Sequence, residues 1–365
     1  MKFEIKKPVF ENVLTKASSV LATKDLLPIL KNFNIHVDKE SFLVVATDLE
    51  LSVIAQSELV DCIEAGRAVF PGKKLIDIVK TCEDAIINVT VGDDVAVIDC
   101  AGATWSINLM DADDYPEVPD AETAGAVEVT RTVFANALMK VKGAAAKEGV
   151  RPALQMIDVS GGNIRASDGA VFRQVHVDEL ESIEMQIPLG AVEDLIKLLR
   201  STEAEKMGIG QTEDHLLFLI GGDVFIITKA NVEYPDVEGL LLGPARKNKI
   251  NLTSDRTQFI NGIRRVRVTA DEDTKGLIMV LTENKLVLKS RDKYGNFAEQ
   301  VLDVHYVDED RILGVNHENM IDALQAADSP SISVMLGEDS KTRKSPLFIE
   351  DKEVVAVLQQ LKLDI

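Results

Sequence analysis

The sequence predicts an α+β protein built from three repeated domains, each made of a βαβββ unit used twice. Two observations support this fold class. Short landmark motifs recur at a spacing near 118 residues, and the hydrophobic pattern between them changes from alternating to helical in the same order each time. A chain of 365 residues is long enough for three such domains, and 46% hydrophobic content excludes a disordered or fibrous protein.

The repeat rests on four pairs of short motifs. Each pair joins similar residues in the first and second thirds of the chain, and a third copy of the second motif is expected at 313–315. The pairs are DYPEV at 114–118 with EYPDV at 233–237, FPG at 70–72 with IPL at 187–189, ATD at 46–48 with ASD at 166–168, and GDDV at 92–95 with GGDV at 221–224.

The elements follow in order within each third. A short alternating strand precedes a helix with apolar residues at helical spacing, expected at 8–23, 131–147 and 254–268. Three strand-like runs follow, and then a second helix led by Pro or Gly, expected at 70–80, 187–200 and 313–327. Closing strands such as INVTV and VAVID are joined by a Gly-Asp-Asp hairpin turn.

Two linkers divide the thirds. Residues 119–126 are small and acidic, and 239–249 contain Gly-Pro and a basic cluster, so the predicted domains are 1–120, 127–245 and 246–365. In such a domain, alternating strands place one face on a core that amphipathic helices cover. Three domains joined end to end form a curved chain, which a symmetric oligomer could close into a ring.

The charge distribution is uneven. A net charge of −20 argues at first against a nucleic acid partner, because phosphate affinity comes mainly from Lys and Arg. The six helical segments, however, carry 15 basic and 8 acidic residues, or +7, which leaves −27 for the remainder. If the helices share one side, that side attracts phosphate electrostatically and without sequence preference. No aromatic residues lie among these basic residues, so base stacking is not expected.

Signatures of catalysis are missing from the sequence. It has no GxxxxGK[ST], HExxH or GxSxG motif, and its five histidines lie far apart with no cluster of metal ligands beside them. Cys62, Cys82 and Cys100 lack CxxC spacing and are expected to be buried, reduced thiols. No catalytic residue, metal site or cofactor is therefore predicted. The first residues have no apolar export segment and no run approaches ~18 apolar residues, which predicts a cytoplasmic protein without membrane contact.

Several motifs together resemble the bacterial DNA polymerase III β subunit family, the sliding clamps. The likeness spans nearly the whole chain and is carried by LLPIL at 26–30, ATDLE at 46–50, FPGKKL at 70–75, YP at 115–116, VRPAL at 150–154, ASDG at 166–169 and YPD at 234–236. The resemblance implies the DNA clamp fold, in which three domains form half of a head-to-tail homodimeric ring. Helices line the lumen of that ring and sheets lie outside.

The resemblance also implies a function. It indicates a non-catalytic processivity factor that encircles duplex DNA and binds DNA polymerase and an ATP-driven clamp loader through short peptide motifs. The alternative is an acidic protein with the same fold that acts as an adaptor or decoy without encircling DNA, and a monomer in solution would favour it.

Site residues follow from the resemblance position by position. The expected DNA-binding residues are Lys24, Lys73, Lys74, Lys80, Lys147, Arg151, Lys197 and Arg200, with the arginines of 254–268 as additions. The expected partner-peptide pocket comprises Leu154, Ser167, Gly169, Ala170, Val171, Phe172, Pro235, Leu240, Val357, Gln359 and Leu361. The expected dimer interface comprises Lys74, Trp105, Ile107, Val268 and Thr269, with the strand near 300–304.

The pocket departs from the family's usual pattern at two places. Ala170 and Val171 stand where His-Arg is usual, and Gln359 and Gln360 stand where Met-Pro is common. These positions set the polar contacts of the pocket, and with them the choice of partner peptide.

Overall fold

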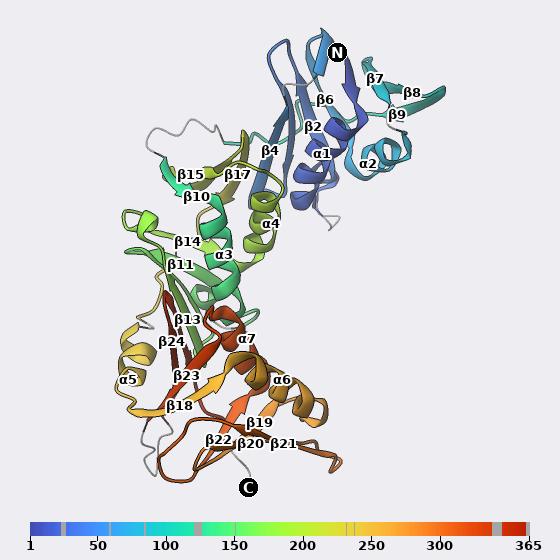
Figure 1. The fold of residues 1–365 in the computed structure, drawn as a ribbon. Helices are drawn as coiled ribbons and strands as arrows, with labels where there is room; N and C mark the ends of the chain where they lie inside the picture. The colour runs from blue at the N-terminus through green and yellow to red at the C-terminus, as the bar shows by residue number, and fades with distance from the viewer. Residues whose placement is uncertain are drawn as a thin grey trace. The chain divides into compact units, whose positions relative to one another are not determined.

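The computed structural model describes all residues except 23–26, 58–59, 84, 120–125, 150, 231, 237, 338–344 and 363–365. It divides into two compact units (Figure 1). The first unit contains Met1–Ala135 and Gly190–Ala230, and the second contains Asn136–Leu189 and Asn231–Ile365.

The first unit contains the strands and helices of the first third of the chain and half of those of the middle third. The elements of the first third are β1 (Lys2–Lys6), α1 (Lys7–Ala17), β2 (Asn32–Val37), β3 (Phe42–Thr47), β4 (Leu51–Ser57), β5 (Val60–Glu64), β6 (Gly66–Pro71), α2 (Gly72–Thr81), β7 (Ile86–Val91), β8 (Val95–Cys100) and β9 (Ala103–Asn108). Those of the middle third are β10 (Val127–Thr130), β15 (Lys206–Gln211), β16 (His215–Ile220), β17 (Asp223–Thr228) and α4 (Leu189–Arg200) beyond its first residue.

The second unit contains the other half of the middle third and the last third. Its elements are β11 (Met156–Ser160), β12 (Asn163–Ser167), β13 (Val171–His176), β14 (Met185–Pro188), α5 (Gly243–Ala245), β18 (Ile250–Asp255), α6 (Arg256–Val266), β19 (Gly276–Thr282), β20 (Lys285–Arg291), β21 (Phe297–Asp303), β22 (Arg311–Asn316), α7 (His317–Ala326), β23 (Ser331–Leu336), β24 (Leu347–Asp351) and β25 (Val354–Leu358). Helix α3 (Arg131–Val141) is divided between the units.

The element order confirms the predicted repeat. Each third runs βαβββ twice, and the first third adds β5, which pairs with β1 outside the repeating pattern. Alternation of buried and exposed residues explains the strands, as in β19, where every second side chain is buried. Helices α1 and α2 pack together, as do α6 and α7 (Figure 1). The apolar stripe of each of these helices faces a sheet.

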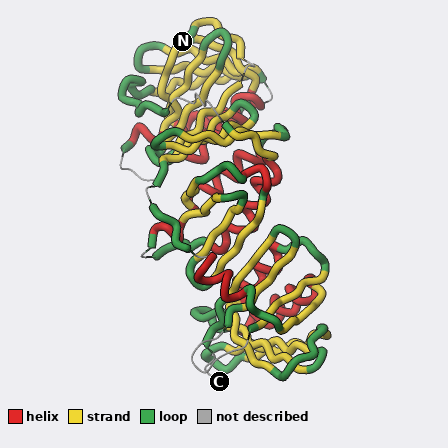
Figure 2. The backbone as a smooth tube through the Cα atoms, turned by 90° about the vertical axis from the view of Figure 1, so that its left-hand side faces the viewer, coloured by secondary structure: helices red, strands yellow, loops and turns green. Residues whose placement is uncertain are grey.

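In the part of the chain that the structure describes, four antiparallel sheets organise the fold, and Figure 2 shows their strands side by side. Two sheets have eight strands, in the orders β10-β15-β16-β17-β4-β3-β2-β6 and β14-β11-β12-β13-β25-β24-β23-β18. The other two are β5-β1-β7-β8-β9 and β21-β20-β19-β22. Each eight-stranded sheet joins strands of two neighbouring thirds, through β17 with β4 and β13 with β25. The middle third therefore contributes strands to both units.

Apolar side chains from sheet and helix form the cores. In the first unit Phe3, Phe10 and Phe42 are fully buried, with ring centroids 5.4–6.1 Å apart. These residues come from β1, α1 and β3, so the cluster fixes the helix on the sheet.

Two sequence interpretations were wrong. The GDDV and GGDV motifs are not equivalent, because 92–94 is the β7–β8 turn whereas 221–222 is the β16–β17 turn. The segment 239–249 is not a simple linker either. It begins in a π-helical turn, Glu238–Leu242, which continues into α5, and Leu242 and Ala245 are fully buried. The run LLL at 240–242 was the signal that could have predicted this.

Candidate functional site

Helix α2 presents three lysines on its exposed surface. Lys73, Lys74 and Lys80 are exposed, whereas Leu75 and Ile78 on the same helix are buried. Positions 73 and 80 are two helical turns apart and lie on one face, with position 74 beside them. No ion pair within the described part of the chain involves these side chains, which we call the α2 lysines. They form a cationic stripe facing solvent.

The other predicted DNA-binding residues have different surroundings. Lys147 and Arg151 are exposed beside the turns that follow α3. Lys197 is 68% exposed and binds Asp194 at 2.8 Å; the hydrogen bond from Lys197 to this carboxylate raises the pKa of the ammonium. Arg200 is exposed at the end of α4. The remaining candidate, Lys24, lies outside the described residues.

Several basic residues counted on the helices are used inside the fold. Lys16 Nζ lies 2.6 Å from Asp223 Oδ2, and Lys140 Nζ lies 2.7 Å from Asp328 Oδ2. Arg256 donates to the carbonyl of residue 327 at the end of α7. On the last third, by contrast, Arg264, Arg265 and Arg267 are exposed. The exposed helical charge is therefore smaller than the sequence count.

The structure brings together part of the predicted peptide pocket. Leu154, Phe172 and Val357 belong to one apolar cluster in the second unit, here called the Phe172 cluster. Sequence reasoning missed the other buried members, which are Leu241, Leu242, Ala245, Phe348 and Val355, with Ala146, Tyr234 and Met335 packed against them. Leu240, adjacent in sequence, is 66% exposed, and Pro235 is half-buried. The cluster thus carries an exposed apolar side chain at its margin.

A tight turn next to the cluster contains further predicted pocket residues. Ser167 is fully buried; its Oγ donates to the carbonyl of Val171 at 2.6 Å and accepts from the amide of Gly169 at 3.0 Å. Asp168 Oδ1 accepts from the amides of residues 170 and 171. Gly169 has a φ of +92°, a conformation that favours glycine. Ser167 and Gly169 therefore shape the turn, while Ala170 at its tip is exposed.

The C-terminal segment runs beside this turn. The amide of Gln359 donates to the carbonyl of Ala170 at 2.8 Å, and the amide of Leu361 donates to the carbonyl of Gly314 at 2.8 Å. Both side chains are half-buried. Backbone bonds thus bring the two departures from the family pattern, at 170–171 and 359–360, next to each other.

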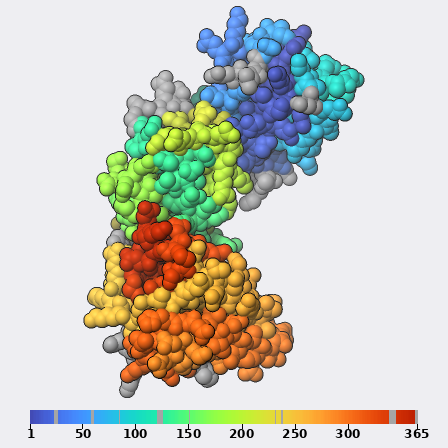
Figure 3. All heavy atoms as spheres, viewed as in Figure 1, coloured from blue at the N-terminus to red at the C-terminus, as the bar shows by residue number. Residues whose placement is uncertain are grey.

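The predicted interface residues lie on strands β9 and β21, on the turn after α6, which contains Val268 and Thr269, and on α2, which contains Lys74. Trp105 is half-buried and Ile107 is 7% exposed on β9, the last strand of its sheet. Val268 is 81% exposed, and Thr269 shares a hydrogen bond of 2.7 Å with Ser290. Strand β21, the end strand of the four-stranded sheet, exposes Phe297 and Val301, and this part of the chain lies at the surface in Figure 3.

Titratable clusters are few in the described ranges. His176, Asp178 and Glu181 place potential ligand atoms within 4.8 Å of one another, which the sequence did not predict, and the His176 Nε2 to Asp178 Oδ1 distance is 3.0 Å. Cys82 and Cys100 are buried as expected, but Cys62 is only half-buried. Burial together with the nearby Cys100 thiol raises the pKa of Cys82 to about 12. No helix among the described residues is both long and apolar enough to cross a bilayer.

Comparison with known proteins identifies relatives along the chain. Residues 1–119 match the family described as DNA polymerase III beta subunit, N-terminal domain, and 244–362 match the C-terminal domain of that subunit. A beta sliding clamp from Vibrio cholerae is 24% identical over 372 residues, covering 100% of both chains.

Solved structures share the fold. The DNA polymerase III subunit beta from Pseudomonas aeruginosa superposes with a TM-score of 0.90 at 21% identity, covering 99% of this chain and 100% of that one. A sliding clamp from Bartonella birtlesii bound to griselimycin gives 0.91 at 22% identity, covering 100% of both chains.

Proposed function

The chain belongs to the DNA polymerase III beta subunit family and is a sliding clamp, and we propose that it closes as a head-to-tail homodimeric ring around duplex DNA. In this proposal it acts without catalysis. The ring holds DNA topologically, while a peptide site on each chain tethers DNA polymerase and the clamp loader. The domains 1–120, 127–245 and 246–365 are the repeating segments of the ring.

The observation that carries the proposal is how the thirds are joined. In both eight-stranded sheets, the fourth strand of one third pairs with the last strand of the next third, as β4 does with β17 and β13 with β25. The fourth strand of the last third is β21, and the last strand of the first third is β9. The same rule pairs β21 of one copy with β9 of a second copy. Such pairing would cover two otherwise open sheet edges.

The internal joins also predict the register of this pairing. At the first join Ser52 lies opposite Ile226, and at the second join Phe172 lies opposite Val357. Ser52 on β4 and Phe172 on β13 each pair with the last residue of the strand before them in the chain, β3 and β12. On β21, Phe297 holds the same position, because it pairs with the last residue of β20.

Counting from the hairpin turn gives the matching residue on β9. Ile226 and Val357 are the fourth residues after the two-residue turns that begin β17 and β25, and Ser106 is the fourth after the equivalent turn before β9. Phe297 of one copy therefore lies opposite Ser106 of the other.

Side-chain size supports this register. One residue further along, Val53 faces Phe225 at the first join, and Arg173 faces Ala356 at the second. The same step pairs Ala298 with Trp105. At each join a larger residue faces a smaller one, as close packing between paired strands requires.

Light scattering and cross-linking test the ring. We expect a dimer mass, and we expect the variant with both Ser106→Cys and Phe297→Cys to form covalent dimers with a short thiol cross-linker. Ser106→Cys with Ala298→Cys is the control, because one residue of offset points the thiols to opposite faces. A monomer at micromolar concentration would overturn the ring and favour the adaptor alternative.

A size exchange tests the pairing itself. Ala298→Trp places two indoles opposite each other, so we expect at least a tenfold weaker dimer. Adding Trp105→Ala to the same chain restores one large and one small partner and should recover the dimer. Parent-like dimerisation of Ala298→Trp alone would contradict the β9–β21 pairing.

DNA binding in this proposal is electrostatic and topological. The α2 lysines, with Lys147, Arg151, Lys197 and Arg200, would hold the phosphate backbone through many weak, solvated contacts that permit sliding. The protein should be retained on nicked circular duplex and lost when the circle is linearised. Equal retention on both would refute encirclement.

The Phe172 cluster is the proposed peptide site, accepting a short segment that ends in Leu or Phe. Leu240 is the exposed apolar side chain at the margin of this cluster, so Leu240→Ala should weaken peptide binding about 5- to 30-fold without unfolding, as removal of an apolar contact of ~1–2 kcal/mol does. Val307→Ala, at a residue 72% exposed in the same unit, is the matched control and should bind as the parent does. Equal affinities for the two variants would place the site elsewhere.

A further inference from the structure

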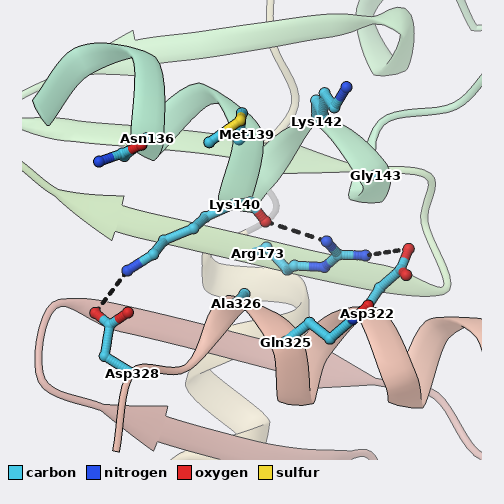
Figure 4. A pocket seen from close by; sticks show the side chains of 10 residues that line it. All are labelled: Asn136, Met139, Lys140, Lys142, Gly143, Arg173, Asp322, Gln325, Ala326 and Asp328. Carbon is cyan, nitrogen blue, oxygen red and sulfur yellow. Dashed lines mark hydrogen bonds and ion pairs between the residues drawn. The ribbon is translucent and has the colours of Figure 1, made fainter. Parts of the chain in front are cut away.

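A cavity of about 620 Å³ lies between α3 and α7 in the second unit (Figure 4). Gly143 follows α3 on one side, and Asp322 and Gln325 line it from α7 on the other. Arg173, from β13, lies between the two helices, and its guanidinium points along the cavity wall toward Asp322. This cavity belongs neither to the α2 lysines nor to the Phe172 cluster.

Arg173 is buried but incompletely paired. Its side chain is 3% exposed; Nη1 donates to the carbonyl of Lys140 at 3.1 Å, and Nη2 lies 3.4 Å from Asp322 Oδ2. Nε has no acceptor among the described residues. Burial lowers the pKa of this guanidinium, while Asp322 opposes that shift. A buried cation without full pairing is costly, which suggests that its donors serve another group.

The carboxylate beside Arg173 is a weak partner. Asp322 is 46% exposed, so it can turn toward solvent, and its contact at 3.4 Å is longer than a usual charge-assisted hydrogen bond. The other carboxylate in the cavity, Asp328, is bound by Lys140. With Lys142 also at the wall, three cationic side chains line the cavity against two anionic ones.

We propose that this cavity binds one phosphate-type oxyanion, which Arg173 holds through Nε and Nη2 after Asp322 turns away. These two nitrogens lie on one edge of the guanidinium and match two oxygens of a phosphate. The Gln325 amide and Lys142 stand on the walls of the same cavity. The oxyanion could be a free phosphate compound or a backbone phosphate of nucleic acid.

Gly143 offers a way to close the site without removing charge. A Cβ at this position would lie 3.1 Å from Asp322 Oδ2 and 3.2 Å from both Nη atoms of Arg173. Its backbone does not require glycine, since φ is not positive there. Gly143→Ala therefore puts a methyl group against the guanidinium and should obstruct the oxyanion while the chain still folds.

The test measures pyrophosphate binding to the full chain by calorimetry at low ionic strength. We expect at least a tenfold loss for Arg173→Gln, a clear loss for Gly143→Ala, and a several-fold gain for Asp322→Asn, because the competing carboxylate is removed. Lys293→Gln, an exposed charge elsewhere in the unit, is the control and should leave affinity unchanged. Thermal melts check that each variant is folded.

The gain in pyrophosphate affinity expected for Asp322→Asn distinguishes an oxyanion site from a purely structural ion pair between Arg173 and Asp322. If Arg173 and Asp322 only hold α7 in place, Asp322→Asn lowers stability and does not raise affinity, and that result would overturn the proposal. Linear duplex DNA distinguishes the two sources: weaker duplex binding by Arg173→Gln indicates a backbone phosphate, and a response to pyrophosphate alone indicates a free compound. The readout does not depend on ring closure, so failure of the dimer would leave it intact.

Discussion

Lys16 and Lys140 hold equivalent positions in two copies of the same helix, yet they should contribute very differently to stability. Each is the residue before the last in an eleven-residue helix, and each forms an ion pair between neighbouring thirds of the chain. The Lys16 and Asp223 side chains are 11% and 1% exposed, whereas those of Lys140 and Asp328 are 24% and 51% exposed. Replacing each lysine by Met keeps the length of the side chain and removes the charge.

The expected magnitudes follow from burial. Without Lys16, the buried Asp223 carboxylate keeps only the Gln56 amide, at 3.0 Å, as a hydrogen-bond donor among the described residues. Removing one partner of a buried pair costs ~3–5 kcal/mol, whereas an exposed pair contributes about 0–1 kcal/mol. Lys16→Met should therefore lower the free energy of unfolding several times more than Lys140→Met. Adding Asp223→Asn to Lys16→Met should recover much of the loss, since it removes the unpaired charge.

Urea unfolding measures this difference. The chain's single tryptophan, Trp105, lies in the same unit as Lys16 and Asp223, so its fluorescence follows that unit, and circular dichroism follows the whole chain for Lys140→Met. Equal losses for the two variants, or a loss below about 1 kcal/mol for Lys16→Met, would refute the assignment of the Lys16 pair as a buried structural contact.

Three further outcomes are expected. Charge reversal of the α2 lysines should impair retention on nicked circular duplex without unfolding the chain, whereas Lys285→Glu on β20 should leave retention unchanged; equal retention would exclude the stripe as a DNA contact. Burial lowers the pKa of His317 below its usual 6.5, so protonation opposes folding and stability should fall as pH drops below about 6.5. His317→Phe should flatten that pH dependence of urea midpoints, and an unchanged slope would contradict it. At pH 8, Cys62 should react with a thiol reagent before Cys82, whose pKa is raised; mass spectrometry of the native protein reads the order.

Local pattern predicted the elements of this fold but not their joins. Alternation in IINVTV and the proline before α2 were sufficient to place β7 and the start of that helix. The pairing of β4 with β17 joins residues about 170 positions apart, and no local periodicity encodes it. Strand β5 was not predicted for a related reason. It pairs with β1, far from it in the sequence, and has no counterpart in the other two thirds.

The candidate site shows the same limit for individual side chains. The resemblance pointed to Ser167, but only the structure shows that its hydroxyl is bonded within a turn and fully buried. Leu241 and Leu242 were assigned to a linker, since a glycine and a proline next to them indicated a break in structure. Their burial depends on β24 and β25 far along the chain, which place Phe348 and Val357 against them.

Ion pairs between residues far apart in the sequence reduce the positive charge that the helices expose. Lys16 and Lys140 were counted as surface charge, but their partners lie 207 and 188 residues away, so both charges are neutralised between thirds. Arg265 stands at the equivalent position of α6 and is exposed. In the proposed ring, the first third of a second copy would lie next to it. The α2 lysines form no such pair in the described chain. Phosphate attraction should therefore rest on the α2 lysines with Lys147, Arg151, Lys197 and Arg200, and not be spread evenly over six helices.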